Sequence, residues 1–485
     1  MFIEALKKLD RRSFLKLWFW SSAGLVAGCR PSSSASPTLQ STPTATPLST
    51  ASASEPSSDI PQVIIVGAGI SGLAAAQALT QNGFSVVVLE ARNRIGGRVW
   101  TDRSLGLPLD LGASWIHGIE GNPISSLVEQ FNLTTVPTDY DSRTLYNPDG
   151  NELTEAQLLD LETQFDDLLV ALDAERERRL AADDPDISLQ EAIGLVLADQ
   201  DFDTEALRAL NFSINTTIEH EYASDVSDLS LFNWDAAGDF KGGDVIFPEG
   251  YDQIAHGLAQ GLDIRLEQVV EKIEIESDRV RVRTQTGSMV ARQVLVTLPL
   301  GVLKAGRVTF SPPLPESKQQ AIARLGINVL NKVYLKFPKV FWAETDLLGY
   351  IAENKGEWAE YVNIHKYTDA PVLLCFNAGA FGLAIEAWTD AEIIAAVLEV
   401  LGTIYAAVPE PEGFLITRWN ADPFARGSYS HFAPGSGPAE AEALAEPIDD
   451  RLFFAGEATY PEHQATVHGA YLSGVRAAKQ IYDLV

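Results

Sequence analysis

The sequence predicts an α/β protein in which a Rossmann-like domain is interleaved with a second, α+β domain. Residues 63–90 have the pattern of a strand, a glycine turn, a helix, a second strand and an acid, which is the unit of a doubly wound sheet. A length of 485 residues with 46% apolar content is enough to bury two sizeable cores. Glycine-rich, strand-like segments recur at 61–140, 241–310 and 441–485, and helical patterns occupy 141–240 and 311–440. We therefore expect two interwoven domains.

The unit at 63–90 predicts a dinucleotide site. The glycines Gly67, Gly69 and Gly72 follow an apolar strand, so the backbone can approach a pyrophosphate at the N-terminus of the helix expected over 71–81. The second strand ends at Glu90, where a carboxylate accepts hydrogen bonds from both hydroxyls of an adenosine ribose. Because the strand, the turn, the helix and the acid all fit the dinucleotide-binding motif, a dinucleotide site is favoured over a tight strand-to-helix turn without a ligand.

A second glycine turn favours FAD over NAD as the bound dinucleotide. The stretch ARNRIGGRV at 91–99 is rich in guanidinium groups, and DLGASWIHG follows at 110–118. A permanently buried flavin needs extra clamps on its phosphates and ribityl chain, which a nicotinamide enzyme does not need. Arg92 and Arg98 are expected to reach the same anion. The alternative is a surface loop with scattered arginines.

From about residue 61 to the C-terminus the chain resembles the flavin-containing amine oxidases, the family of polyamine oxidases, monoamine oxidases and the lysine-specific histone demethylase, and it is most similar to the polyamine oxidases. Besides the two glycine turns, the matching blocks are FPEGY at 247–251, VLVTLPLGVL at 294–303, NKVYLKFP at 331–338, RWNADPFARGSYS at 418–430, and 453–477. The resemblance implies the amine oxidase fold. Its FAD-binding domain would comprise 61–140, 241–310 and 441–485, and its substrate-binding domain 141–240 and 311–440.

The resemblance also implies which residues hold the cofactor. The expected FAD-binding residues are Gly67, Gly69, Ile70, Ser71, Gly72, Glu90, Ala91, Arg92, Gly97, Arg98, Gly112, Ala113, Ser114, Trp115, Val270, Trp419, Gly456, Glu457, Thr466 and Val467. Ser428 stands where monoamine oxidases carry the cysteine that bonds the flavin, so we expect non-covalent FAD. For Trp419, a place in the hydrophobic core explains the residue nearly as well.

Three residues are expected to be catalytic: Lys332, His117 and Tyr429. Lys332 matches the family lysine that holds a water beside flavin N5, whereas strand alternation alone would turn Lys332 and Lys336 outward to solvent. Tyr429 resembles one wall of the aromatic cage that guides the amine, and Thr466 occupies the opposing wall. His117 would contact the distal amine of the substrate, with a purely structural histidine as the alternative.

The expected reaction is hydride transfer from the carbon next to the amine nitrogen to flavin N5. This gives an imine that hydrolyses to an aldehyde and an amine, with O2 as acceptor giving H2O2, or with another electron acceptor. The expected substrate is a polyamine such as spermidine or spermine, with Asp225 as a carboxylate for a second ammonium group unless it is merely solvated.

Two alternative functions remain open at this point. One is an L-amino-acid oxidase or dehydrogenase on the same fold, which needs an inward arginine such as Arg143, Arg208 or Arg324. The other is a non-catalytic lipoprotein that binds polyamines.

The N-terminus predicts export. DRRSFLK at 10–16 matches a twin-arginine signal, and the apolar run at 17–28 is too short to span a bilayer stably. VAGC at 26–29 resembles a lipoprotein cleavage box, which would make Cys29 a lipidated first residue, although a chance cysteine is the alternative. Residues 30–60 have the composition of a disordered linker. We expect a periplasmic or cell-surface bacterial lipoprotein that uses the twin-arginine export machinery and meets the membrane only through its lipid.

Charge and composition exclude some partners. The formal net charge is −30, so nucleic acid is a poor binding partner. The electrostatic field of an acidic protein is compatible with a small polycationic substrate but does not require one. With two cysteines and seven histidines, neither thiol count nor histidine spacing supports a metal site.

Overall fold

The structure, a computed structural model, describes residues 61–484. The predicted export signal, Cys29 and the linker at 30–60 lie outside the described residues. Within 61–484, no helix is both long and apolar enough to cross a membrane.

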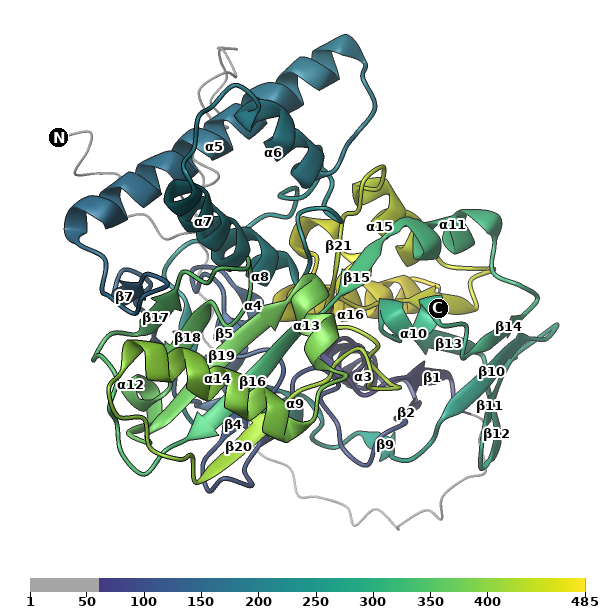
Figure 1. The fold of residues 1–485 in the computed structure, drawn as a ribbon. Helices are drawn as coiled ribbons and strands as arrows, with labels where there is room; N and C mark the ends of the chain where they lie inside the picture. Colours follow the sequence, from purple (N-terminus) through teal and green to yellow (C-terminus); the bar gives the residue numbers. More distant parts are fainter. Residues whose placement is uncertain (1–60, 485) are drawn as a thin grey trace, which may run out of the picture. The chain divides into compact units, whose positions relative to one another are not determined.

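A five-stranded parallel sheet is assembled from three distant parts of the chain (Figure 1). Its order is β22 (Leu452–Phe454), β13 (Gln293–Val296), β1 (Val63–Val66), β2 (Val86–Leu89) and β9 (Asp263–Arg265). The four residues of β1 are almost fully buried, as expected for a parallel sheet covered on both faces. All five strands come from 61–140, 241–310 and 441–485.

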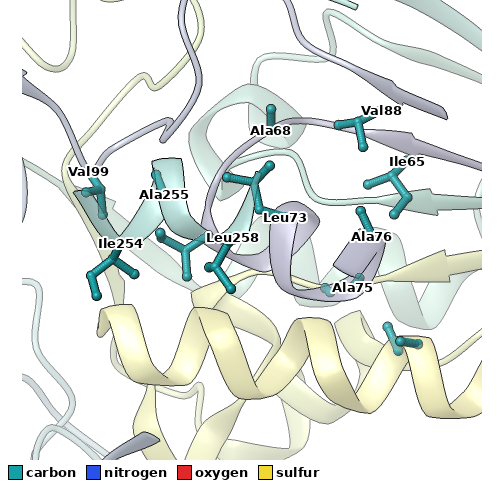
Figure 2. Packing of buried hydrophobic residues seen from close by; sticks show 14 of the residues in the cluster. Ile65, Ala68, Leu73, Ala75, Ala76, Val88, Val99, Ile254, Ala255 and Leu258 are labelled. Carbon is teal, nitrogen blue, oxygen red and sulfur yellow. The ribbon is translucent and has the colours of Figure 1, made fainter. Parts of the chain in front are cut away.

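Helices cover one face of this sheet and a second sheet covers the other. Helix α3 (Ile70–Gln81) begins one residue before the predicted position and ends at Asn82 and Gly83. It packs with α9 (Asp252–Leu258) and α16 (Val467–Tyr482) around a core that includes Leu73 and Ile254 (Figure 2). The opposite face shares a core with a four-stranded sheet in the order β12 (Gly287–Ala291), β11 (Val280–Thr284), β10 (Val270–Ile275) and β14 (Thr309–Ser311).

Strands from 141–240 and 311–440 form a six-stranded, mainly antiparallel sheet. Its order is β20 (Gly413–Ile416), β16 (Leu330–Lys336), β19 (Val372–Ala378), β18 (Glu360–Asn363), β17 (Leu347–Tyr350) and β7 (Arg143–Tyr146). Val333 and Leu335 face a core shared with α13 (Gly379–Ile385) and α14 (Asp390–Ile404). Tyr334 on the other face packs with Leu109 and Leu111. Because both faces are covered, strand alternation does not distinguish an inward side chain from a solvent-facing one here.

A helical segment follows β7 (Figure 1). It contains α5 (Glu155–Ala182), α6 (Leu189–Leu197), α7 (Thr204–Ser213), the π-helix η2 (Ile214–Glu219) and α8 (His220–Tyr222). Helix α5 starts with a capping box between Thr154 and Gln157 and buries one stripe that includes Leu161 and Leu168. The π-helix η2 lies between α7 and α8. Short π-helical turns of this kind are frequent at functional sites.

The remaining elements are short connections around these layers. They are β3 (Thr101–Asp102), β4 (Leu109–Asp110), β5 (Trp115–Ile116), α4 (Pro123–Phe131), β6 (Val136–Pro137), β8 (Val245–Ile246), α10 (Leu300–Lys304), α11 (Glu316–Arg324), β15 (Gly326–Asn328), α12 (His365–Thr368), β21 (Tyr429–His431), α15 (Pro438–Ala445), η3 (Glu457–Thr459) and η4 (Pro461–His463).

A buried lysine joins three of these elements. Lys318 of α11 is 2% exposed, and its Nζ donates to the carbonyl oxygens of Ala443, Leu444 and Glu446, at 2.9, 2.7 and 2.8 Å, where α15 ends. We expect Lys318→Met to lower the free energy of unfolding by roughly 3 kcal/mol, because it leaves buried carbonyls unpaired. Urea unfolding of Lys318→Met beside Lys339→Met, a charge-matched change at an exposed site, measures this. Equal midpoints would contradict it.

Candidate active site

The turn before α3 forms a cradle for an anion. Gly67 has a φ of +110°, and a Cβ on Gly72 would lie 2.0 Å from the carbonyl oxygen of Gly67, so the turn requires glycine at both positions. A Cβ on Gly69 would meet no atom within 4 Å. The N-terminus of α3 has neither a side-chain cap nor an acid in its first turn. Open space in front of uncapped amides fits the pyrophosphate of a dinucleotide.

Glu90 lies at the carboxyl end of β2, as predicted, and is 6% exposed. Its Oε2 accepts from the amide of Ala68 at 2.8 Å and its Oε1 from the amide of Arg92 at 2.9 Å. A carboxylate offers about four lone pairs, so these contacts leave room for ribose hydroxyls. The amide of Gln268 donates to the backbone oxygen of Glu90 at 2.8 Å, which brings the start of β10, and Val270, close to this region.

The two arginines of the second turn lie in different surroundings. Arg92 donates to both carboxylate oxygens of Asp422, at 2.9 and 2.7 Å. Arg98 donates to Glu457 Oε1 at 2.8 Å and to the carbonyl oxygen of Ser428 at 3.0 Å. The charge of Arg92 is therefore already paired in this structure. Its contact with a phosphate stays a prediction.

The second expected clamp lies beside Arg98. A Cβ on Gly456 would meet no atom within 4 Å, and the amide of Gly456 donates to Ser473 Oγ at 2.9 Å. Thr466 caps α16, its Oγ1 accepting from the amide of Gly469 at 2.9 Å. Arg98 and Gly456 border a small cavity lined by Arg98, Val296, Leu298, Leu300, Leu303, Leu444, Phe454, Ala455, Gly456, Glu457, Ala458 and Thr459. The open space in front of Gly456 leaves room for a cofactor to approach the backbone.

Lys332 points inward, so the outward orientation expected from strand alternation is wrong. Its Nζ donates to the carbonyl oxygens of Asp110 and Gly112, at 2.8 and 2.6 Å, and to Ser114 Oγ at 2.6 Å. The residue is 4% exposed. Three acceptors match the three N–H groups of an ammonium. The water-holding role that the resemblance implied stays a prediction.

The electrostatics of Lys332 and Asp110 are coupled. Burial lowers the pKa of Lys332 below its ordinary value, and the Asp110 carboxylate opposes this shift. Burial raises the pKa of Asp110 itself. The carboxylate is held by Thr101 Oγ1 at 2.5 Å and by the amide of Tyr251 at 3.0 Å. A cation therefore lies beside the predicted FAD-binding segment with a carboxylate close behind it.

Aromatic rings surround the Lys332 ammonium. Its Nζ lies 5.7 Å from the ring centroid of Trp115 and 5.8 Å from that of Phe376. Trp115 Nε1 donates to Thr138 Oγ1 at 2.9 Å. Trp419 is 4% exposed, and its amide donates to Asn331 Oδ1 at 3.1 Å, next to Lys332. The rings of Trp115 and Phe376 form apolar walls beside the buried charge.

Tyr429 and Ser428 lie at the edge of this region. The Tyr429 hydroxyl donates to the backbone oxygen of His220 at 2.7 Å. Ser428 Oγ donates to the backbone oxygen of Leu330 at 3.2 Å and accepts from the Leu330 amide at 2.8 Å. Ser428 therefore positions the start of β16, the strand that carries Lys332.

The two predicted substrate contacts differ in their surroundings. His117 Nδ1 lies 2.6 Å from Asp244 Oδ2, a buried carboxylate that the sequence interpretation missed. The ring is held with Nδ1 toward Asp244. Asp225 Oδ2 accepts from the amide of Ala380 at 2.7 Å, in the first turn of α13. Asp225 thus has a structural contact of its own, and its role toward a substrate stays a prediction.

Sequence interpretation also missed three residues near Lys332: Phe376, Glu360 and His220. Phe376 pairs with Lys332 across β16 and β19, and Glu360 pairs with Phe376 across β18 and β19. His220 packs edge-on against Phe376, with ring centroids 5.8 Å apart. Glu360 could have been noticed from the sequence, because it is an acid in the otherwise mainly apolar stretch AEYVNI at 359–364 and buried acids are uncommon.

Among residues 61–484, no group of three or more histidine, cysteine or acidic side chains is arranged to hold a metal ion.

Comparison with known proteins identifies the family. The family model described as flavin containing amine oxidoreductase matches residues 70–482. The chain is 38% identical over 439 residues to polyamine oxidase 4 of Oryza sativa subsp. japonica, covering 87% of this chain and 88% of that protein. It is 37% identical over 438 residues to polyamine oxidase 2 of Arabidopsis thaliana, covering 86% and 87%. Lysine-specific histone demethylase 1 homolog 2 of Arabidopsis thaliana is 38% identical over 435 residues, covering 86% of this chain and 58% of that protein.

A solved structure of putrescine oxidase bound to putrescine has the same fold, with a TM-score of 0.72 and 23% identity, covering 87% of this chain and 99% of that one. The predicted amine oxidase fold is therefore confirmed. The chain belongs to the flavin-containing amine oxidoreductases and is an FAD-dependent enzyme that oxidises amines.

Proposed function

We propose that this enzyme oxidises an aliphatic polyamine, such as spermidine or spermine, and passes the electrons to O2. The observation that carries the proposal is the Lys332 ammonium, buried against Gly112 and Ser114 of the predicted FAD-binding segment and surrounded by aromatic rings. Similarity to polyamine oxidases over most of the chain supports this substrate class. The net charge of −30 favours the approach of a polycation.

The proposed reaction breaks one C–H bond next to nitrogen. The carbon loses a hydride and the nitrogen loses a proton, so the amine becomes an imine, which water hydrolyses to an aldehyde and a shorter amine. FAD, when bound, supplies the acceptor for the hydride. Two electrons and two protons then reduce O2 to H2O2. Ser428 lacks the thiol that would attach a flavin, which supports non-covalent FAD.

The residues of the chain position the reactants and exclude water. The rings of Trp115, Phe376 and Tyr429 provide apolar walls that favour a neutral amine over an ammonium at the reacting nitrogen. His117, oriented by Asp244, presents its other ring nitrogen for hydrogen bonding to an amine. Lys332 provides a fixed positive charge, which lowers the cost of the negative charge that develops as O2 takes up electrons.

The arginines required by an L-amino-acid oxidase have other partners. Arg143 pairs with Glu162. Arg208 lies 3.6 Å from Glu353, and the Arg324 side chain, 3.3 Å from Glu440, is 57% exposed. No specific contact of these three guanidinium groups favours recognition of a substrate carboxylate.

Anaerobic mixing tests the proposed substrate class. The purified holoenzyme is mixed with spermidine, spermine, putrescine, butylamine, L-lysine or L-arginine, and the loss of flavin absorbance is followed. We expect the polyamines to bleach the flavin at least about tenfold faster than the amino acids, because the amino acids carry a carboxylate that must be desolvated beside Phe376 and Trp115. Faster bleaching by an amino acid would overturn the substrate class. Binding of spermidine without bleaching would exclude spermidine as the substrate.

A further inference from the structure

We propose that the buried carboxylate of Asp110 is the counter-ion that keeps the Lys332 side chain charged inside the protein, and that Asp110 is thereby a positioning residue for the reaction with O2. The inference rests on the proposed function, because it assumes that the positive charge of Lys332 assists the reduction of O2. Asp110 opens the segment DLGASWIHG at 110–118, and no role was predicted for it from the sequence.

The first argument is the contact between β16 and Asp110. Lys332 Nζ donates to the backbone oxygen of Asp110 at 2.8 Å, and the Tyr334 hydroxyl donates to the same oxygen at 2.7 Å. Lys332 and Tyr334 are two residues apart on one strand, so both project from the same face of β16. The residue that carries the buried carboxylate is therefore bound directly to the ammonium whose charge it would balance.

The second argument is that the immediate surroundings of Lys332 Nζ carry no charge. Its acceptors are two carbonyl oxygens and the hydroxyl of Ser114, and the rings of Trp115 and Phe376 beside it are also uncharged. A buried ammonium without a compensating negative charge tends to lose its proton. Burial lowers the pKa of Lys332, and the Asp110 carboxylate raises it. Lys332 therefore needs this counter-ion in order to act as a cation.

The third argument is that the contacts of the Asp110 side chain suit an ionised carboxylate. Its Oδ1 accepts from Thr101 Oγ1 at 2.5 Å and from the amide of Tyr251 at 3.0 Å, and its Oδ2 lies 3.3 Å from the same amide. The amide of Asp252 donates to Thr101 Oγ1 at 3.2 Å, which leaves the hydroxyl hydrogen of Thr101 for Asp110. An ionised carboxylate only accepts hydrogen bonds, and both of its neighbours donate. Burial raises the pKa of Asp110, and these two hydrogen bonds oppose that shift.

The other titratable groups around Asp110 do not replace it as the counter-ion. Asp252, at the start of α9, accepts from Arg103 at 2.7 and 2.8 Å, so its charge is already paired. Burial, and then the charge of Asp110, raises the pKa of the Tyr251 and Tyr334 hydroxyls well above the ordinary value, so both are uncharged. Asp110 is therefore the acid that is available to balance the buried ammonium.

Titration of Lys332 itself tests the counter-ion without turnover. The oxidised holoenzyme is prepared with lysine labelled with carbon-13 at Cε, and the chemical shift of this carbon, which follows the protonation of Nζ, is measured against pH. The signal of Lys332 is the one that is missing from Lys332→Met. An ammonium exists below its pKa, and Asp110 raises that pKa. We expect the midpoint of the Lys332 titration to fall by at least about one pH unit in Asp110→Asn.

Three further variants make the result specific. Glu249→Gln removes the same charge from an exposed side chain in the turn before Tyr251, and it should leave the midpoint of Lys332 unchanged. Thr101→Val removes the hydroxyl that stabilises the carboxylate, so the carboxyl group holds its proton more readily and the midpoint of Lys332 should again fall. Thr101→Ser keeps the hydroxyl and should keep the wild-type midpoint. If Asp110→Asn does not retain flavin, the two Thr101 variants decide the matter.

The reaction with O2 should follow the same titration. Between the two midpoints Lys332 is charged in the wild type and neutral in Asp110→Asn, so reoxidation of the variant should be slower there by roughly tenfold or more. Below its own midpoint, Asp110→Asn should approach the wild-type rate, whereas Lys332→Met should stay slow. Stopped-flow absorbance at a series of pH values measures this. Slow reoxidation of Asp110→Asn at every pH would indicate a structural effect and would overturn the inference.

The outcomes separate the counter-ion from the function on which it rests. An unchanged midpoint of Lys332 in Asp110→Asn, or in Thr101→Val when that variant decides, would overturn the inference and leave the proposed function intact. An equal fall of the midpoint in Glu249→Gln would also overturn it, since any acid would then have the same effect. Reoxidation of Lys332→Met at the wild-type rate would instead contradict the role of this lysine in the proposed function, and with it the task assigned to Asp110.

Discussion

Lys332→Met should slow the oxidation of the reduced enzyme by O2 by roughly 100-fold while leaving anaerobic reduction by the amine nearly unchanged. Uptake of electrons by O2 develops negative charge, and a preorganised cation in a water-poor site lowers the cost of that charge. Met has a similar length and no charge, so the surrounding rings stay packed. Stopped-flow absorbance measures the two half-reactions separately.

Lys336→Met is the matched control for Lys332→Met. Lys336 lies on the same strand and face, and its Nζ donates to the backbone oxygen of Leu105 at 2.9 Å. Its removal should leave both half-reactions within about twofold of the wild type. Reoxidation at the wild-type rate in Lys332→Met would exclude the proposed role of this charge. Equal losses in both lysine variants would point to a general effect on the sheet.

Gly69→Ala should weaken FAD binding while preserving the fold. A Cβ at this position meets no protein atom within 4 Å, and the backbone φ of −76° is one that alanine adopts without strain. The methyl group would instead occupy the space in front of the helix amides, where a pyrophosphate must approach closely. We expect the affinity for FAD to fall at least about tenfold, with thermal unfolding of the apoprotein unchanged, as measured by flavin fluorescence and circular dichroism.

Gly72→Ala is the informative contrast to Gly69→Ala. Its Cβ would lie 2.0 Å from the Gly67 carbonyl oxygen, so the turn itself must move. This variant should lose both the cofactor and thermal stability. If Gly69→Ala bound FAD as tightly as the wild type, the pyrophosphate could not lie at this turn.

The local parts of the site were predictable because their signals are contiguous in sequence. The strand, glycine turn, helix and acid at 63–90 lie within one stretch of chain, and the structure places α3 and Glu90 where that pattern predicts. Such segments specify their own geometry through backbone sterics and capping.

The parts that could not be predicted depend on contacts between distant segments. Lys332 faces inward because Asp110, Gly112 and Ser114 supply its acceptors, and alternation within β16 carries no information about them. The ion pair of Arg92 with Asp422, 330 positions away, was also unpredictable because it joins distant segments. The placement of Glu360 depends on strand register, where a shift of one residue would turn the side chain to the other face.

A crystal structure of the reduced holoenzyme with bound putrescine tests the central claim most directly. The account predicts that the FAD pyrophosphate lies against Gly69, that the flavin lies beside Gly112 and Ser114 near Lys332, and that one nitrogen of the diamine lies beside the flavin. A cofactor bound elsewhere, or a diamine bound away from the flavin, would contradict it.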